Sequence, residues 1–366
     1  MKEKFTPQPR FEDIVAEAEQ QINRAGYELE QKFLQCIVGH REKYPVNEFL
    51  FEVGGVPVIT RGDLHTIGAK QKGGKTSFVT ILIAAMLSGQ WDRVRSLTRK
   101  SAILYVDTEM KQYDTQQLGR KAARMAGVRT ATMERRVHLV NFRPLTPAEM
   151  EQGIRYFIGR FSPSLVIIDG VVDLCANFND VEASQRLVLD FLMKTAEEHQ
   201  CAIVSVLHTN KTDGYSELRG HLGAFFEQKG ATVIKCDKDD ANNLVTVHFP
   251  THRYAPVPDL HFTFSASDGT PVPAEDLYAR IQQEEQLSRE EKKAAEKQAL
   301  YEQRAQVILS VIREHGGSIE RKELVEEAMK RIRAKNSLVC ALLKKMRDSD
   351  APLIVEDSKT IMLANS

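Results

Sequence analysis

The sequence lacks the features of a secreted or membrane-spanning protein. Its 366 residues include only five cysteines, none in a C-x-x-C pair, and their odd number and scatter argue against a disulfide framework. Residues 78–87 form the longest apolar-rich run, well short of the roughly 20 residues that a transmembrane helix needs. The first nine residues are polar and carry no signal-peptide core. We therefore expect a cytoplasmic protein without membrane contact.

An excess of charge of either sign is also missing. The 50 Lys and Arg residues balance 50 Asp and Glu residues, whereas chains that bind nucleic acid usually show a basic excess. The balance is nevertheless a sum of unlike regions. Residues 1–52 have a net charge of −3, and residues 320–347 have a net charge of +5. DNA therefore remains a candidate partner, chiefly for the basic tail.

Four regions differ in character. Residues 1–49 form an N-terminal helical segment, with apolar positions three and four apart over 10–43 that we expect to pack on a neighbouring subunit. Residues 50–270 alternate short apolar strands with helical stretches, which is typical of an α/β core with a mainly parallel sheet. Residues 271–304 are rich in Gln, Glu, Lys and Ala and read as a helical linker, in which Ser288-x-x-Glu291 fits a capping box. Residues 305–366 predict three helices and a β-hairpin, the order of a winged helix.

The core is expected to contain seven strands. The first five alternate with helices, and the last two are joined by a polar turn, so an antiparallel pair closes the sheet. The predicted strands are Leu64–Ile67, Ala102–Val106, Val137–Asn141, Leu165–Ile168, Ala202–Leu207, Ala231–Cys236 and Leu244–Phe249.

Residues 69–76, A-K-Q-K-G-G-K-T, follow the first strand and open an apolar helix. They fit a P-loop, although Ala69 stands where glycine is usual. Such a loop turns backbone N–H groups toward phosphates, while Lys75 reaches the β- and γ-phosphates and the Thr76 hydroxyl binds Mg²⁺. The alternative is a glycine-rich turn before a helix. The predicted ATP-binding residues are Ala69, Lys70, Gln71, Lys72, Gly73, Gly74, Lys75, Thr76 and Ser77.

Two later strands end in carboxylates. Leu165-Val-Ile-Ile-Asp169 resembles a Walker B strand, whose aspartate would hold Mg²⁺ at the carboxyl end of the sheet. Ile103-Leu-Tyr-Val-Asp107-Thr-Glu109 follows the P-loop helix and offers Glu109, or Asp107, as a base for the attacking water. In both cases the alternative is a carboxylate that caps a helix.

Together with the polar strand end Val206-Leu-His208-Thr-Asn, these motifs resemble the RecA/DnaB ATPase core. The nearest resemblance is to the RepA-like plasmid helicase group, AAA-family ATPases of mobile elements. It implies a RecA-like fold, bound ATP and Mg²⁺, Glu109 as catalytic base, and a ring, specifically a hexamer, that acts on DNA. It also implies that His208 senses the γ-phosphate, whereas His208 alone would be read as a buried imidazole.

The resemblance also indicates contacts outside the P-loop. A polar segment, residues 209–223, would face the central channel, so that Lys211, Arg219 and His221 become candidates for binding single-stranded DNA. The alternative is a solvated surface loop. Lys235 and Lys238 are candidate cations acting on the neighbouring subunit's nucleotide, with Arg219 and Arg253 as competitors. The lack of arginine between Lys235 and Asn243 departs from the family pattern.

The third tail helix predicts a second DNA contact. Its apolar residues fall on one side, which leaves Lys344, Lys345 and Arg347 available to duplex DNA. A winged helix that binds protein is the alternative. The sequence therefore predicts an ATP-dependent ring-forming DNA motor, a helicase or loader in replication or mobilisation. Two other functions stay open: a DNA-binding regulatory switch that does not unwind, and a RecA/RadA-like recombination mediator.

Overall fold

The computed structural model describes residues 20, 24, 26–98, 101–175, 177–210 and 217–364. The chain divides into two compact units, residues 1–49 and 50–366, and each is described by itself. In the first unit, residues 26–35 are helical and residues 43–48 are irregular. The helix predicted over 10–43 therefore ends at Gln35, just before Ile37-Val38-Gly39, residue types that disfavour helix. Residues 10–19 of that prediction lie outside the described residues.

A nine-stranded sheet forms the core of the second unit, in the order β13-β12-β11-β10-β3-β9-β8-β6-β7. All seven predicted strands are present, and the strands from β10 to β7 in this order are parallel. The strands β10, β11, β12 and β13 pair antiparallel. Their bounds are β3 (Leu64–Ala69), β6 (Ile103–Asp107), β7 (Val137–Asn141), β8 (Leu165–Asp169), β9 (Ala202–His208), β10 (Thr232–Asp239), β11 (Leu244–His252), β12 (Leu260–Phe264) and β13 (Pro271–Pro273).

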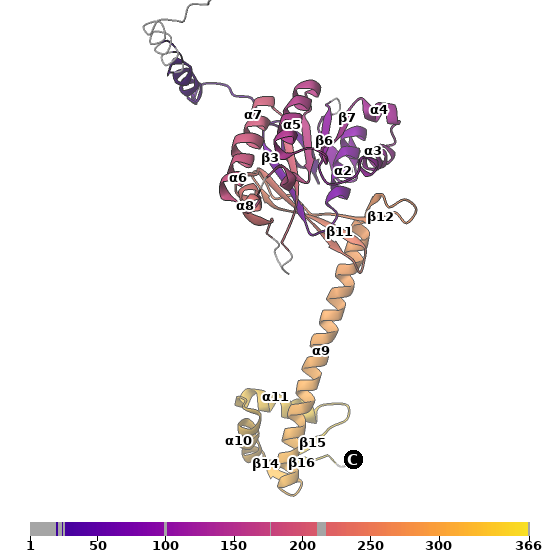
Figure 1. The fold of residues 1–366 in the computed structure, drawn as a ribbon. Coiled ribbons are helices and arrows are strands. Elements are labelled where there is room, and N and C mark those ends of the chain that lie inside the picture. The colour runs from indigo at the N-terminus through magenta and orange to yellow at the C-terminus, as the bar shows by residue number, and fades with distance from the viewer. Residues whose placement is uncertain are drawn as a thin grey trace, which may run out of the picture. The chain divides into compact units, whose positions relative to one another are not determined.

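Helices cover both faces of this sheet because successive strand residues point to opposite sides. Ile103 and Tyr105 of β6 pack with α2 and α3 on one face, whereas Leu104 and Val106 pack with α5 and α8 on the other (Figure 1). The predicted α/β class with a mainly parallel sheet is confirmed for this core. The helices are α2 (Lys75–Ser88), α3 (Gln112–Met125), α4 (Thr130–Glu134), α5 (Pro147–Phe161), α6 (Val181–Gln185), α7 (Lys194–His199) and α8 (Gly220–Lys229), with a 3₁₀ turn at Val171–Leu174 and a π-helical stretch at Arg186–Met193.

The sequence pattern did not reveal a second, four-stranded sheet in the order β2-β1-β5-β4. Its strands are β1 (Phe49–Val53), β2 (Val56–Thr60), β4 (Gln90–Trp91) and β5 (Val94–Ser96). Leu50, Phe51 and Val94 bury their side chains in the same cluster as α2. This sheet therefore belongs to the core on the α2 side.

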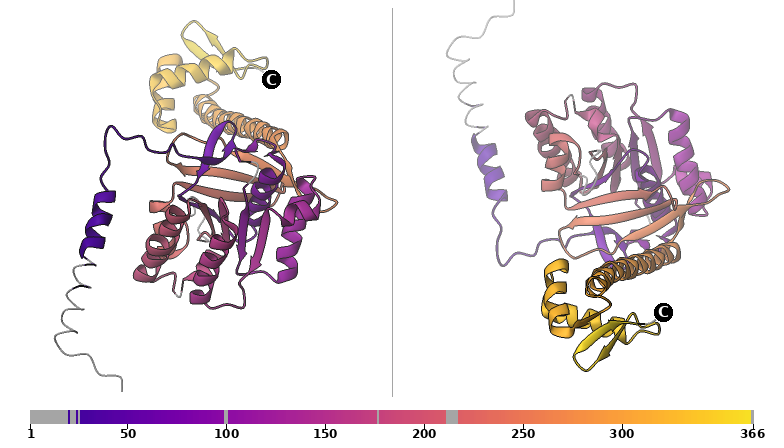
Figure 2. Two further views of the ribbon diagram at one scale, coloured as in Figure 1. Left: turned by 90° about the horizontal axis from the view of Figure 1, so that it is seen from above. Right: turned by 90° about the horizontal axis from the view of Figure 1, so that it is seen from below.

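After β13 the chain continues as one helix, α9 (Glu275–Glu314), of 40 residues. Figure 1 shows it without interruption, and Figure 2 views it along its axis. The predicted boundary between a linker at 271–304 and a helix from 305 is wrong, because no glycine or proline interrupts residues 275–314. Ser288-x-x-Glu291 lies inside this helix and does not begin one. Among the described residues, no helix is both long and apolar enough to span a bilayer.

The C-terminal region has its own apolar core, built on the last turns of α9. It comprises β14 (Ser318–Glu320), α10 (Arg321–Ile332), α11 (Asn336–Arg347), β15 (Ile354–Asp357) and β16 (Thr360–Leu363), with the sheet order β14-β16-β15. The helices and the hairpin thus occur in the predicted order, and β14 is an addition. The winged-helix assignment itself stays a prediction.

The buried imidazole of His65, on β3, makes the stability of the core depend on pH. It lies 3.0 Å from the carbonyl oxygen of Thr60, and burial lowers the pKa of His65 to about 4, against about 6.5 in an unfolded chain. As the pH falls, the unfolded chain binds the proton first. The free energy of unfolding is therefore greatest above pH 6.5 and declines by about 3 kcal/mol toward pH 4.

We expect His65→Gln to remove most of this decline. Urea unfolding at pH 6.5 and pH 5 should show a loss smaller by about 2 kcal/mol in the variant than in the wild type. His199→Gln is the matched control, because His199 is exposed at the end of α7. An unchanged decline in His65→Gln would show that another group causes the pH dependence.

Candidate active site

The predicted P-loop is a tight turn between β3 and α2. Its two glycines have no room for a side chain: a Cβ on Gly73 would lie 2.9 Å from Cβ of Ala69, and one on Gly74 would lie 2.8 Å from Cγ1 of Val245. Gly74 also has a φ of +95°, which favours glycine. Within the described part of the chain no side chain caps α2, which begins at Lys75. Its first backbone N–H groups are therefore available to an anion.

Lys75 is largely buried and turned back onto the loop. Its Nζ lies 3.4 Å from the carbonyl oxygen of Ala69, 3.3 Å from that of Lys70, and 3.0 Å from Nδ1 of His208. Burial lowers the pKa of Lys75, while the carboxylates of Asp169 and Glu109 act in the opposite direction. Its present partners are uncharged acceptors, so a phosphate oxygen would be a stronger partner for this ammonium group.

Asp169, at the end of β8, lies beside the first turn of α2. The Tyr105 hydroxyl donates to its Oδ2 at 2.8 Å, and the Thr76 side chain also hydrogen-bonds to its carboxylate. Burial raises the pKa of Asp169, and these two hydrogen bonds lower it. The structure thus brings together the two residues predicted to hold the metal. Tyr105 was missed by the sequence analysis, since a tyrosine inside a buried strand resembles any core residue.

The oxygen donors at this point fit Mg²⁺. No three His, Cys, Asp or Glu side chains cluster as a possible metal site within the described residues. An ion held by Thr76 and Asp169 would therefore take its remaining ligands from phosphate and water, which is how Mg²⁺ is usually bound in proteins. Burial of the Asp169 carboxylate adds to this fit, because a buried anion is stabilised by a cation.

Glu109, two residues after β6, packs against the end of β8. A Cβ on Gly170 would lie 2.8 Å from Cγ of Glu109 and 2.1 Å from Oγ1 of Thr108, and Gly170 has a φ of +95°. Desolvation, and then the carboxylates of Asp169 and Asp173, raise the pKa of Glu109. The sequence analysis missed Gly170, although a glycine directly after a Walker B aspartate was a visible signal.

Asp107 is not available as a base. It is fully buried, and its Oδ1 accepts from the backbone N–H groups of Glu109 at 3.0 Å and Met110 at 2.9 Å. Its Oδ2 accepts from the Thr115 hydroxyl. The prediction of Asp107 as a second candidate base is therefore wrong, because its acceptors are committed to the turn that carries Glu109.

His208 ends β9 directly beside the P-loop strand, paired in register with Ala69. Burial, and then the positive charges of Lys75 and Arg219, lower the pKa of His208. A neutral imidazole whose Nδ1 accepts from the Lys75 ammonium is consistent with this direction. The predicted phosphate sensor thus touches the predicted phosphate-binding lysine.

The candidate DNA contacts of the core lie just beyond His208. The Arg219 backbone N–H donates to the His208 carbonyl at 3.2 Å, and its guanidinium lies 4.8 Å from the Phe178 ring centroid. His221 is exposed in the first turn of α8. Lys211 lies outside the described residues. Arg219 and His221 therefore stand close to the sensor strand, as a channel-facing segment would require.

The candidate finger residues have partners within their own chain. Lys235 pairs with Glu227 at 3.1 Å, and Arg253 pairs with Asp63 at 3.3 Å. Lys238 pairs with the exposed Asp240 at 2.8 Å. Lys238 also lines a cavity over the P-loop of its own subunit, a position that the sequence pattern did not indicate.

The basic tail is partly neutralised by carboxylates outside the stretch that defined it. Arg347 pairs with Glu356 at 2.7 Å and with Asp348 at 2.8 Å. The Lys345 ammonium lies 3.8 Å from the Tyr301 ring centroid, and Lys344 is exposed. Of the three predicted duplex contacts on α11, Lys344 is thus the most accessible.

Other tail cations gather at the turn between α10 and α11. Lys330, Arg333 and Lys335 line a groove of about 580 Å³ there, with Met329 in its wall. All three belong to the basic stretch, but sequence analysis did not separate them from its other members. They are the cations of this region best placed to meet a phosphate backbone.

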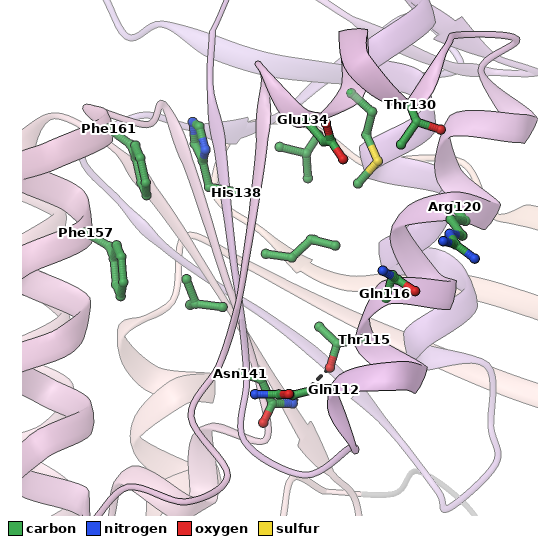
Figure 3. Close-up of a pocket in the computed structure, with 14 residues that line it drawn as sticks. Gln112, Thr115, Gln116, Arg120, Thr130, Glu134, His138, Asn141, Phe157 and Phe161 are labelled. Atoms are coloured by element: carbon green, nitrogen blue, oxygen red, sulfur yellow. Dashed lines mark hydrogen bonds between the residues drawn. The ribbon is translucent and has the colours of Figure 1, made fainter.

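A larger cavity, of about 630 Å³, lies away from the P-loop along β7, the last strand of the sheet. Figure 3 shows an aromatic side, with His138 stacked on Phe161 at 3.7 Å between ring centroids, and a polar side with Gln116 and Arg120. None of the residues predicted for nucleotide or DNA binding lines it. Its size therefore does not make it the catalytic centre.

Residues 53–214 match a family model described as an AAA domain. None of the curated proteins matches the chain. Among solved structures, the chain is similar to the ATPase domain of a replicative helicase, at 17% identity over 59% of this chain and 86% of that chain, with a TM-score of 0.43. It is also similar to the RadB recombinase, at 16% identity over 59% of this chain and 92% of that chain, with a TM-score of 0.43. The AAA-domain match contains Lys75, Glu109, Asp169 and His208, and it supports the predicted P-loop ATPase core.

Proposed function

We propose that the protein is a Mg²⁺-dependent ATPase that assembles as a ring and couples ATP hydrolysis to DNA unwinding or loading. The observation that carries the ATPase part is the meeting of Lys75, Thr76, Glu109, Asp169 and His208 at one end of the parallel sheet. They come from α2, β8, β9 and the turn after β6. Open α/β sheets bind ligands at this edge.

In the proposed reaction, each of these residues has a separate task. Glu109 takes a proton from the attacking water, whose oxygen bonds to the γ-phosphorus as the bond to the bridging oxygen breaks, giving ADP and phosphate. A raised pKa suits Glu109 to this work near neutral pH. Lys75 leaves its carbonyl partners and binds phosphate oxygens. Mg²⁺, held by Thr76 and Asp169, would supply charge neutralisation on the phosphates.

DNA as the partner is proposed on the distribution of cations. Arg219 and His221 adjoin the sensor strand, and Lys330, Arg333, Lys335 and Lys344 give the C-terminal region, proposed as a winged helix, an exposed basic surface. Binding of this kind should weaken steeply with salt, because it displaces counterions from the phosphates. A hexameric ring, and membership of the RepA-like group, are proposed on the sequence motifs.

A second candidate function is an ATP-dependent DNA-binding switch without unwinding. It is favoured by the ion pairs of Lys235 and Arg253 within their own subunit. A motor whose turnover needs a cation from the next subunit would have to break such a pair. A RecA/RadA-like recombination mediator stays a third possibility on the sequence motifs alone.

Three measurements on the full-length protein separate these functions. We expect ATP hydrolysis that requires Mg²⁺ and rises with single-stranded DNA, light scattering that reports a ring, and displacement of a labelled strand in the presence of ATP. DNA-stimulated hydrolysis without strand displacement would favour the switch. A chain that neither binds nor hydrolyses ATP would refute the proposed function altogether.

A further inference from the structure

The antiparallel strands that close the sheet touch the P-loop directly. A Cβ placed on Gly74 would meet Val245 of β11 at 2.8 Å and Phe262 of β12 at 3.6 Å. These strands therefore form a wall beside the start of α2. The wall is on the opposite side of β3 from β9, because β3 lies between β9 and β10 in the sheet.

A cavity of about 180 Å³ lies between this wall and the loop. Its lining consists of P-loop residues 72–77 and two side chains from elsewhere, Lys238 of β10 and Phe264 of β12. The Lys238 ammonium lies 5.9 Å from the Phe264 ring centroid. An aromatic face and a cation thus flank the phosphate-binding loop, and neither takes part in the proposed hydrolysis.

The sheet order gives a nucleotide bound here a direction. The candidate catalytic groups Glu109, Asp169 and His208 come from β6, β8 and β9, all on one side of β3. The γ-phosphate must point to that side for hydrolysis to occur. The nucleoside end then points to the other side, toward β10 and β12, where the cavity lies.

We propose that Phe264 is the stacking platform for the nucleotide base and that Lys238 binds the α-phosphate of the same nucleotide. This inference rests on the proposed function, and it assigns Lys238 to its own subunit's nucleotide. Lys238 can exchange Asp240 for a phosphate readily, since the Asp240 side chain is 87% exposed and exposed ion pairs are weak.

The platform also predicts the class of nucleotide. Every base has a face that can stack, and stacking alone discriminates poorly between bases of similar size. Among the residues that line this cavity, none besides Lys238 and the loop itself is polar. We therefore expect ATP and GTP to bind within a few-fold of each other, and both to bind more tightly than CTP or UTP.

The test uses binding of ADP and of inorganic tripolyphosphate, which has no base. Phe264→Ala should weaken ADP binding about 10-fold and leave tripolyphosphate binding unchanged, whereas Phe264→Tyr should bind ADP like the wild type. Lys238→Ala should weaken ADP binding and retain the preference for purines. Tyr113→Ala is the matched aromatic control, because Tyr113 is 68% exposed on α3 and does not line the cavity.

A fluorescence reporter keeps the test informative if Phe264→Ala perturbs folding. The chain has one tryptophan, Trp91, so Trp91→Phe combined with Phe264→Trp places a single tryptophan at the platform. We expect its emission to change with ADP and not with tripolyphosphate. Unchanged emission, or loss of ADP affinity in Tyr113→Ala but not in Phe264→Ala, would overturn the inference and leave the ATPase proposal intact. Absence of both ADP and tripolyphosphate binding in the wild type would instead defeat the ATPase proposal.

Discussion

Lys75→Ala should lower the rate of ATP hydrolysis about 1,000-fold, the largest effect expected of any single substitution in this chain. Lys75 is the one P-loop side chain that contacts both carbonyl oxygens of the loop and the His208 ring. Its ammonium group would be the main positive charge of the chain on the transferred phosphate. The measurement is steady-state phosphate release with saturating Mg²⁺ and ATP.

Lys229→Ala is the matched control for this substitution, because Lys229 is exposed at the end of α8. It should hydrolyse ATP at the wild-type rate. Thermal unfolding should confirm that Lys75→Ala is folded, since it removes a largely buried side chain. A folded Lys75→Ala variant with wild-type turnover would mean that the P-loop is not the site of hydrolysis.

Glu109→Gln should bind ATP with wild-type affinity and hydrolyse it roughly 100- to 10,000-fold more slowly. The amide keeps the shape of the side chain against Gly170 but cannot accept a proton from water. In the wild type, activity should decline as the pH falls through the pKa of Glu109, which is raised. This decline should therefore begin at a higher pH than for an ordinary glutamate.

Glu134→Gln serves as the isosteric control, since Glu134 lies on α4 beside the cavity along β7. It should leave both ATP binding and turnover unchanged. Full turnover by Glu109→Gln would remove the base assignment. Asp107 could not replace it, because both of its carboxylate oxygens are already hydrogen-bonded.

The strands of the core could be predicted because each is an apolar run bounded by polar residues. The β1, β2, β4 and β5 strands escaped the prediction because they have five residues or fewer and lie in segments without clear alternation. The uninterrupted helix α9 was missed for a different reason. Its change of composition near residue 304 marks where its side chains become buried, and burial can change along a helix that does not end.

The positions of Lys75, Asp169 and Glu109 could be predicted because parallel strands bring their carboxyl ends to one edge. The contacts that hold them there could not. Tyr105 reaches Asp169 only because β6 and β8 pair with Asp107 opposite Asp169. The place of Lys238 depends on the irregular register of β10 between Val233 and Lys235, and a shift of one residue exchanges the faces of a strand.

The contact between Lys75 and His208 has a thermodynamic consequence. When a phosphate takes over Lys75, the His208 ring loses its partner at the end of β9. A ligand that binds the following residues only when this ring is released will bind more tightly to the nucleotide-loaded protein. By reciprocity it must raise the affinity for nucleotide by the same factor. One hydrogen bond of 3.0 Å therefore sets an upper bound on how strongly this route can couple the two ligands, because the coupling free energy cannot exceed what that contact contributes.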